Sequence, residues 1–167
     1  MSAVVVLVMG VSGVGKSTIA KALAERLGWT FQEGDGFHSP ANVAKMKSGR
    51  PLDDADRAPW LTAIAAWIDR EAAKGAHAVL ACSALKKAYR QVLMEGRPFV
   101  RLVYLEGAHA LIAERLANRK GHYFPPELLD SQFAALEPPG RDERPIVIDV
   151  GLPVETQVGL IAAALGV

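Results

Sequence analysis

The feature that most constrains this chain is the stretch from Val4 to Ser17. It begins with a run of β-branched and aliphatic residues, Val4–Met9, which is typical of a strand buried on both faces of a sheet. The run leads into the pattern G-x-x-x-x-G-K-S, from Gly10 to Ser17, and then into apolar residues with helical spacing. A strand, a glycine-rich turn and a helix in this order predict a P-loop, whereas a merely flexible glycine turn would not need this context.

The parts of this loop have separate chemical roles. Its glycines let the backbone approach a phosphate closely, and the N–H groups of the loop and of the helix start then point at the anion. Lys16 can reach the β- and γ-phosphates of a nucleoside triphosphate, and the Ser17 hydroxyl can ligate Mg²⁺. The candidate nucleotide-binding residues of the loop are Gly10, Ser12, Gly13, Val14, Gly15, Lys16, Ser17 and Thr18.

The composition predicts one ordinary globular domain over residues 1–167. Half of the residues are hydrophobic and 22% are charged, and the net charge of +1 gives no electrostatic case for binding nucleic acid or a membrane. Cys82 is the only cysteine, so a reducing compartment fits. No apolar run approaches the about 20 residues of a membrane span, and the apolar N-terminus lacks the basic segment of a signal peptide. We therefore expect a cytoplasmic protein.

Apolar runs alternate with helical patterns along the chain, an order typical of an α/β fold with a parallel sheet. Strands are expected at residues 4–9, 29–32, 77–82, 99–105 and 146–150. Helices are expected at residues 16–27, 40–48, 59–74, 85–94, 108–119, 126–136 and 154–165. Pro59 is expected in the first turn of its helix, where proline is tolerated. Five parallel strands with the P-loop strand near the centre fit a three-layer small P-loop kinase, which would have the strand order 2-3-1-4-5 and helices on both faces.

A polar segment follows the second strand at the edge where open α/β sheets bind ligands. Asp35 in this segment can accept a proton from an attacking hydroxyl or hold Mg²⁺ through water, and His38 follows it. Glu33 is a weaker candidate for a metal-bound water. The alternative is a plain loop with an Asx-turn and a surface histidine.

Two basic sets accompany this segment. Lys47 and Arg57 belong to the first set, which can bind an anionic substrate, and the planar fork of Arg57 suits a carboxylate best. The second set contains Lys86 and Arg90, which share a helical face. Ser83, at the end of the third strand, lies just before them. A solvated helix face and a helix cap are the alternative interpretations.

A third basic set ends the helix after the fourth strand. Arg115 and Arg119 share a face of that helix and lead into an irregular segment that contains Lys120 and His122. A lid over the P-loop, at about residues 119–126, would close to exclude water, and its arginines would neutralise charge on the transferring phosphoryl group. Cations that merely suit the C-terminal dipole of the helix are the alternative.

The absence of certain motifs narrows the class of P-loop protein to which this chain can belong. The sequence has no Asn-Lys-x-Asp guanine signature and no Asp-x-x-Gly switch, which argues against a GTPase. The third strand ends in Cys82 and Ser83 and offers no acidic Walker-B residue. Asp149 follows an apolar run and mimics one, but it lies on the last expected strand, away from the metal, and is interpreted as structural. The metal would then rely on Ser17, phosphates and water, with Asp35 as a further candidate.

Taken together, these segments resemble the bacterial gluconokinases over nearly the whole chain. The matching motifs are Gly10–Ser17, Gly34-Asp35-x-x-His38, Asn42-x-x-Lys45-Met46-x-x-Gly49-x-Pro51-Leu52-x-Asp54, Asp56-Arg57-x-Pro59-Trp60-Leu61, Ala81-Cys82-Ser83-Ala84-Leu85-Lys86-x-x-Tyr89-Arg90 and Arg115-Leu116-x-x-Arg119-x-Gly121-His122. The P-loop is widely shared, whereas the Cys-Ser-Ala-Leu-Lys and Lys-Met segments are specific. Glu33 stands where the family pattern has Asp, and Ser39 interrupts the usual His-Pro pair.

The resemblance implies ATP-dependent phosphorylation of D-gluconate at the 6-hydroxyl, with Mg²⁺, by a cytoplasmic homodimer with the fold of nucleotide and shikimate kinases. Lys16, Asp35 and Arg119 would be catalytic, and Arg115 would cover the adenine. The residues expected to contact gluconate are Asp35, His38, Lys47, Arg57, Ser83, Lys86, Arg90, His122 and Gln132. A kinase of shikimate or of a nucleoside monophosphate, and a regulatory P-loop ATPase, are the rival functions.

Overall fold

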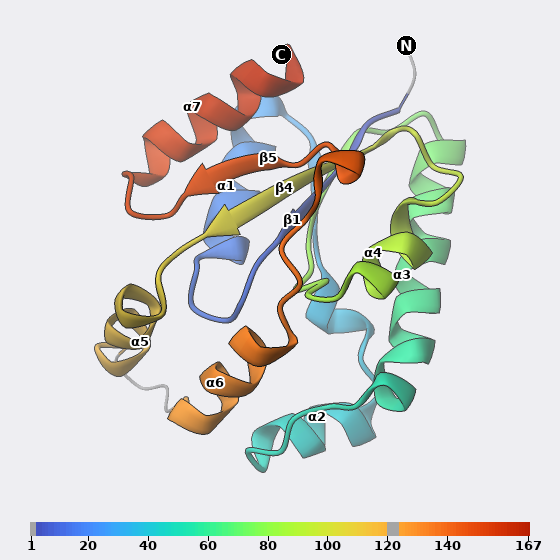
Figure 1. The fold of residues 1–167 in the computed structure, drawn as a ribbon. Helices are drawn as coiled ribbons and strands as arrows, with labels where there is room; N and C mark the ends of the chain where they lie inside the picture. Colours follow the sequence, from blue (N-terminus) through green and yellow to red (C-terminus); the bar gives the residue numbers. More distant parts are fainter. Residues whose placement is uncertain (1–2, 120–123) are drawn as a thin grey trace.

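The centre of the molecule is a five-stranded parallel sheet (Figure 1). The computed structural model describes residues 3–119 and 124–167. The strands are β1 (Val5–Met9), β2 (Thr30–Glu33), β3 (Ala78–Ala81), β4 (Val100–Glu106) and β5 (Ile146–Asp149). Their order in the sheet is β2-β3-β1-β4-β5, which confirms the predicted order. The P-loop strand β1 is therefore central, and Val5 pairs with Ala78 on one side and with Val100 on the other.

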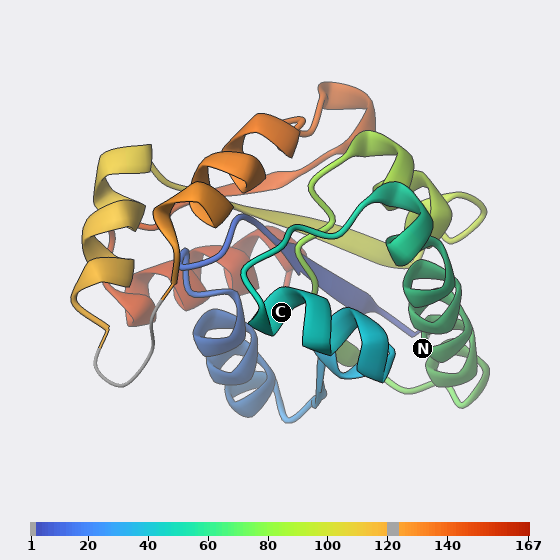
Figure 2. The same ribbon diagram turned by 90° about the horizontal axis from the view of Figure 1, so that it is seen from below.

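Helices cover both faces of this sheet (Figure 1). Helices α1 (Lys16–Leu27), α5 (His109–Ala117) and α7 (Val154–Leu165) pack on one side, and α3 (Asp54–Ala73) and α4 (Lys87–Met94) on the other. Helices α2 (Pro40–Lys47) and α6 (Pro126–Ala135) lie beyond the carboxyl ends of the strands (Figure 2). Short 3₁₀ helices η1 (Gly34–Phe37) and η2 (Arg141–Glu143) complete the description. Within the described residues, no helix has the length and apolar character needed to cross a membrane.

The alternation of β1 side chains explains why its sequence is apolar throughout. Val6 and Val8 point into the core cluster beneath α1 and α7, whereas Val5, Leu7 and Met9 point into the cluster beneath α3 and α4. All five side chains are fully buried. A strand with helices on both faces has no polar side, which is the expected pattern for a central parallel strand.

The prediction for Pro59 was wrong. Helix α3 begins at Asp54, so Pro59 lies in its interior rather than in its first turn. A capping box starts the helix early, because the Asp53 carboxylate accepts from Asp56 N at 2.7 Å and the Asp56 carboxylate accepts from Asp53 N at 3.0 Å. Two satisfied N–H groups and the burial of Trp60 and Leu61 offset the bond that proline cannot donate.

Helix α4 also differs from its predicted bounds. It begins at Lys87 rather than Leu85. Lys86, the N-cap residue, has an extended backbone with a φ of −95° and a ψ of 145°, so the helix cannot include Leu85 or Lys86. The segment from Ser83 to Lys86 is instead a loop at the carboxyl end of β3, and this loop faces the site described below.

Candidate active site

The start of α1 is built to receive an anion. Gly15 is the N-cap residue, with a φ of +96°, and neither a side-chain cap nor an acidic residue occupies the first turn. A Cβ at Gly15 would meet no atom within 4 Å, so the space beside this residue is open. The positive end of a helix with uncapped N–H groups and open space fits the phosphates of a nucleotide.

Lys16 lies at the base of the same loop. Its Nζ donates to the carbonyl oxygen of Val11 at 3.0 Å, and its side chain lines the cleft together with Asp35. Burial lowers the pKa of the Lys16 ammonium, and the negative charges of Asp35 and Glu33 oppose that shift. The carboxylates do not fully compensate for the loss of hydration of this buried cation. Phosphate groups would stabilise it further.

Ser17 and Glu33 form an oxygen pair beside the loop. The Ser17 hydroxyl donates to the Glu33 carboxylate, which joins α1 to the carboxyl end of β2. Hydroxyl and carboxylate oxygens are the ligands that Mg²⁺ accepts. No group of three or more His, Cys, Asp or Glu side chains suited to a metal occurs in the described part of the chain. The pair therefore fits an ion that takes its remaining ligands from phosphates and water.

The segment with Asp35 is held close to the sheet. A Cβ at Gly34 would lie 2.5 Å from the carbonyl oxygen of Ala81, so only glycine fits there. The Gly34 carbonyl in turn accepts a hydrogen bond of 2.7 Å from Trp60 Nε1. These contacts fix η1 between β3 and α3 and direct Asp35 into the cleft.

His38 follows η1 and stacks on Trp60. The ring centroids are 4.3 Å apart and the planes differ by 12°. Burial lowers the pKa of the His38 imidazole, Asp35 raises it, and Arg57 lowers it further. His38 is therefore a rigid and neutral wall of the cleft at neutral pH.

One cleft brings most of the predicted substrate-contact residues together with part of the P-loop. It has a volume of about 830 Å³ and is lined by residues of the P-loop, of the segment from α2 to α3 and of α6. The predicted residues that line it are Ser12, Lys16, Asp35, His38, Lys47, Arg57, Ser83, Lys86 and Gln132. A volume of this size accommodates a small polar metabolite next to the end of a nucleotide.

The cationic side of the cleft is organised around Tyr89. The Arg57 guanidinium donates to the Tyr89 hydroxyl at 3.2 Å and to the carbonyl oxygen of Leu52 at 2.7 Å. Lys86 pairs with Asp54 at 3.0 Å, and the Tyr89 hydroxyl donates to the same carboxylate. Burial and the bond to Asp54 raise the pKa of Tyr89. Arg57 and Lys86 are thereby held side by side, as two cations for one anionic group.

Gln132 connects α6 to the P-loop. Its Oε1 accepts a hydrogen bond of 2.6 Å from Ser12 N. The amide nitrogen of Gln132 belongs to a side chain that lines the cleft, so the residue can contact both the loop and a molecule in the cleft.

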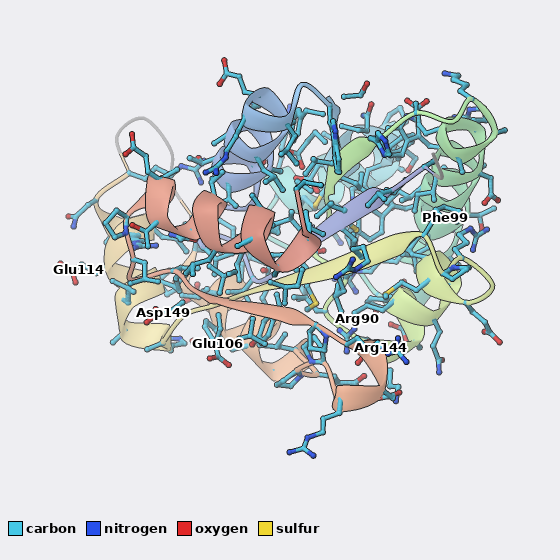
Figure 3. The ribbon with its side chains drawn as sticks, turned by 90° about the horizontal axis from the view of Figure 1, so that it is seen from above. Arg90, Phe99, Glu106, Glu114, Arg144 and Asp149 are labelled. Carbon is cyan, nitrogen blue, oxygen red and sulfur yellow. The ribbon has the colours of Figure 1, made fainter. Side chains whose placement is uncertain are left out.

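The structure does not bring Arg90 into this cleft, contrary to the prediction. Its side chain is 1% exposed, and its guanidinium donates to the carbonyl oxygens of Ala84, Leu85 and Glu137 at 2.8, 3.0 and 2.8 Å. The Glu143 carboxylate accepts from it at 2.6 Å. In Figure 3, Arg90 lies beside Arg144, which precedes β5. Glu106 and Asp149 mark the carboxyl ends of β4 and β5 in the same view. The guanidinium donors of Arg90 are all used within the protein, so Arg90 supports the loop behind the cleft.

The predicted lid arginines lie apart from this cleft, whereas Phe124 and Pro125, from the end of the predicted lid, line it. Arg115 is on α5 and donates to the carbonyl oxygen of Val150 at 2.6 Å, after the end of β5. Arg119 is exposed just beyond the C-terminus of α5. His122 and half of the predicted lid, residues 120–123, lie outside the described residues. The Asp149 carboxylate accepts from Gly151 N at 2.8 Å, a structural contact in the turn after β5.

Sequence reasoning missed several residues of the site. Tyr89 and Asp54 organise Arg57 and Lys86, and Asn42 and Trp60 hold His38. Trp60 was interpreted only as a core residue, and it is 98% buried as well as stacked on His38. The bonds of Tyr89 with Arg57 and with Asp54, and the stack of Trp60 on His38, link segments distant in sequence, so no spacing pattern reveals them.

Comparison with known proteins identifies the family. A family model described as an AAA domain matches residues 5–139. A gluconokinase from Gluconobacter oxydans (strain 621H) is 52% identical over 137 residues, which are 82% of this chain and 77% of that protein. The chain belongs to the gluconokinase family. The thermoresistant gluconokinase of Escherichia coli (strain K12) is 43% identical and matches 96% of this chain and 91% of its own length.

The fold comparison agrees with this assignment to the gluconokinases. The crystal structure of a gluconokinase from Sinorhizobium meliloti 1021 has a TM-score of 0.88 and 41% sequence identity to this chain. It covers 98% of this chain, and the chain covers 91% of it. The likeness therefore extends over the sheet, the P-loop and the elements around the cleft.

Proposed function

We propose that this gluconokinase-family chain transfers the γ-phosphoryl group of Mg·ATP to the 6-hydroxyl of D-gluconate. The observation that carries the proposal is the cleft, in which Lys16 of the P-loop, the Asp35 carboxylate and the paired cations Arg57 and Lys86 line one volume. Gluconate is an anion with a chain of hydroxyls and one primary alcohol. A site for it needs cations for the carboxylate, polar groups for the hydroxyls and a proton acceptor near the phosphates.

In this proposal the nucleotide phosphates bind at the P-loop. Backbone N–H groups from Gly13 to Thr18 and the Lys16 ammonium surround the β- and γ-phosphates. Ser17, with Glu33 beside it, would hold Mg²⁺. When bound, the ion neutralises charge on the β- and γ-phosphates.

Asp35 is the proposed proton acceptor. The oxygen of the 6-hydroxyl attacks the γ-phosphorus, the bond between that phosphorus and the β,γ-bridging oxygen breaks, and ADP leaves with the electron pair. The hydroxyl proton passes to the Asp35 carboxylate as the bond forms. Lys16, whose charge faces Asp35, attracts the phosphoryl group.

The remaining cleft residues are the proposed gluconate contacts. Arg57 and Lys86 would bind the carboxylate, with Lys47 adding positive charge at the rim. His38, Ser83 and Gln132 would bind hydroxyls, because each carries a neutral polar group in the cleft. Arg115 would cover the adenine, and Arg119 and His122 would approach the phosphates from the lid.

The decisive experiment measures ADP release from Mg·ATP with a panel of acceptors: gluconate, shikimate, glucose and nucleoside monophosphates. We expect a large rise over basal hydrolysis with gluconate and little rise with the others. A strong response to shikimate or a nucleoside monophosphate instead would contradict the substrate assignment. Slow hydrolysis that no acceptor accelerates would favour a regulatory ATPase.

We also propose that the enzyme works as a cytoplasmic homodimer, as the resemblance to bacterial gluconokinases implies. The single, buried Cys82 suits a reducing compartment. Light scattering after size-exclusion chromatography tests the dimer directly, and a mass equal to the chain's 17.8 kDa would contradict it.

A further inference from the structure

Asn42 contacts His38 across the start of α2. The Asn42 side chain is buried, and its Nδ2 lies 2.8 Å from the carbonyl oxygen of Asp56 and 3.3 Å from His38 Nδ1. A backbone carbonyl can only accept a hydrogen bond, so the atom that faces Asp56 must be the amide nitrogen. The orientation of the Asn42 amide is therefore fixed by Asp56.

This orientation determines where the imidazole carries its proton. The Asn42 amide nitrogen has two hydrogens, one for the Asp56 carbonyl and one for His38 Nδ1. Nδ1 must accept a hydrogen bond through that second hydrogen, because two donors cannot form a hydrogen bond with each other. The neutral His38 ring then carries its proton on Nε2.

We propose that Asn42 is a positioning residue that keeps His38 Nε2 a hydrogen-bond donor to an oxygen of the sugar acid. The proposal rests on the proposed function, in which His38 contacts gluconate. His38 lines the cleft, and within the described residues no protein group forms a hydrogen bond with Nε2. The stack on Trp60 fixes the plane of the ring and the Asn42 contact fixes the position of Nδ1, so the donor has a fixed direction.

The groups around His38 keep the ring neutral. Asp35 from η1 and Arg57 from α3 are the charged groups that act on it, with opposite signs, and burial adds to the effect of Arg57 in lowering its pKa. Trp60 and Asn42 contribute no charge, and Asp56 offers its carbonyl while its carboxylate pairs with Lys45. A neutral donor recognises a hydroxyl oxygen and leaves the gluconate carboxylate to the cations.

The Asn42→Asp variant tests this role, because a carboxylate accepts where the amide donates. In this variant the neutral His38 ring carries its proton on Nδ1, and the nearby charge raises its pKa. Below that pKa the imidazolium still donates through Nε2, and above it Nε2 only accepts. We expect the KM for gluconate in N42D to rise about tenfold between about pH 5.5 and about pH 8.5, with no such rise in the wild type.

Two further observations separate positioning from mere support of the fold. The KM for ATP should stay similar in wild type and N42D at each pH, and the added His38→Gln substitution should abolish the pH trend. A gluconate KM that is raised equally at all pH values in N42D would overturn the proposal, because a structural defect has no reason to follow the titration of His38.

A measurement on the wild-type protein removes any dependence on variant folding. Nitrogen-15 NMR of the imidazole rings reports which nitrogen carries the proton, and His38→Gln identifies the His38 signals. We expect a protonated Nε2 and an unprotonated Nδ1 at neutral pH, and a protonated Nδ1 would overturn the inference. This result does not depend on gluconate turnover, so failure of the proposed function and failure of the tautomer assignment are distinguishable.

Discussion

Asp35 is the residue on which the proposed chemistry depends most. It lines the cleft with Lys16 and is fixed there by Gly34, which fits only as glycine against Ala81. Asp35→Asn keeps the shape of the side chain and removes its ability to accept a proton. We expect kcat to fall by roughly 10²–10⁴-fold with little change in the KM for ATP, as steady-state kinetics would measure.

A matched control for this variant is Asp142→Asn. Asp142 is exposed and pairs with Lys87 at 2.8 Å, on the part of the molecule near η2. Its kcat should equal that of the wild type. Unchanged turnover in D35N would remove Asp35 as the proton acceptor.

At the residue scale, the sequence predicted which side chains belong to the site better than it predicted their partners. Lys16, Asp35, Arg57 and Gln132 were expected, and all of them line the cleft. These residues were predicted because polar and charged side chains follow the carboxyl ends of strands, where parallel sheets bind their ligands. The contact of Asn42 with His38 was not predictable, because the two residues flank a helix start and helical spacing does not apply there.

At the scale of elements, Arg90 joins parts of the chain that no strand connects. Its guanidinium binds the loop after β3 through Ala84 and Leu85, the end of α6 through Glu137, and η2 through Glu143. The loop after β3 carries Ser83 and Lys86, and α6 carries Gln132. One buried cation therefore sets the distance between two walls of the cleft.

Arg90→Ala should destabilise the protein strongly. Removing one partner of a buried ion pair leaves the Glu143 carboxylate without its cation and three backbone carbonyl groups without the guanidinium donors, which costs about 3–5 kcal/mol of the free energy of unfolding. Arg97→Ala is the control, because Arg97 binds Asp69 at 2.8 Å on the surface and such pairs contribute about 0–1 kcal/mol. Urea denaturation measures both values, and equal losses in the two variants would contradict the role assigned to Arg90.

Element boundaries were the least predictable part of the fold. Pro59 suggested a late start for α3, but the capping box of Asp53 and Asp56 begins the helix at Asp54. The apolar pattern from Leu85 suggested a helix start that the extended backbone of Lys86 excludes. In both cases a local hydrogen bond or a tertiary contact outweighs the propensity of a single residue.

At the scale of the whole molecule, the P-loop and the alternation of strands and helices were enough to predict the sheet. A fully apolar β1 must be central, and parallel strands joined by helices then leave few arrangements. The cleft, in contrast, depends on α2, α6 and the segment between α2 and α3, which cover the carboxyl edge of the sheet. Their placement depends on contacts between distant residues, such as Gln132 with Ser12, which no local pattern encodes.

The free energy of unfolding of the whole molecule should depend on pH through the protonation of His38. Burial lowers the His38 pKa below its ordinary value of 6.5, so the unfolded chain binds a proton more readily than the folded one. The free energy of unfolding should therefore fall as the pH decreases below 6.5 toward the lowered pKa, with no contribution from His38 above that range. Urea denaturation between about pH 7 and about pH 5 measures the fall.

His38→Gln should lessen this fall, whereas His109→Gln should not. His109 is exposed and lies 2.7 Å from the Asp130 carboxylate, so it serves as the surface histidine for comparison. The same pH dependence in H38Q and in the wild type would contradict the half-buried, neutral state assigned to His38.

The most direct test of the central claim is phosphorus-31 NMR of the product formed from Mg·ATP and gluconate. Carbon 6 is the only CH₂OH carbon of gluconate, so a phosphate on it couples to two methylene protons. We predict a new phosphate-ester signal with this coupling, which grows as ATP is converted to ADP. A signal coupled to a single proton would place the phosphate on another hydroxyl, and inorganic phosphate alone would show hydrolysis without transfer; either result would contradict phosphorylation at the 6-hydroxyl.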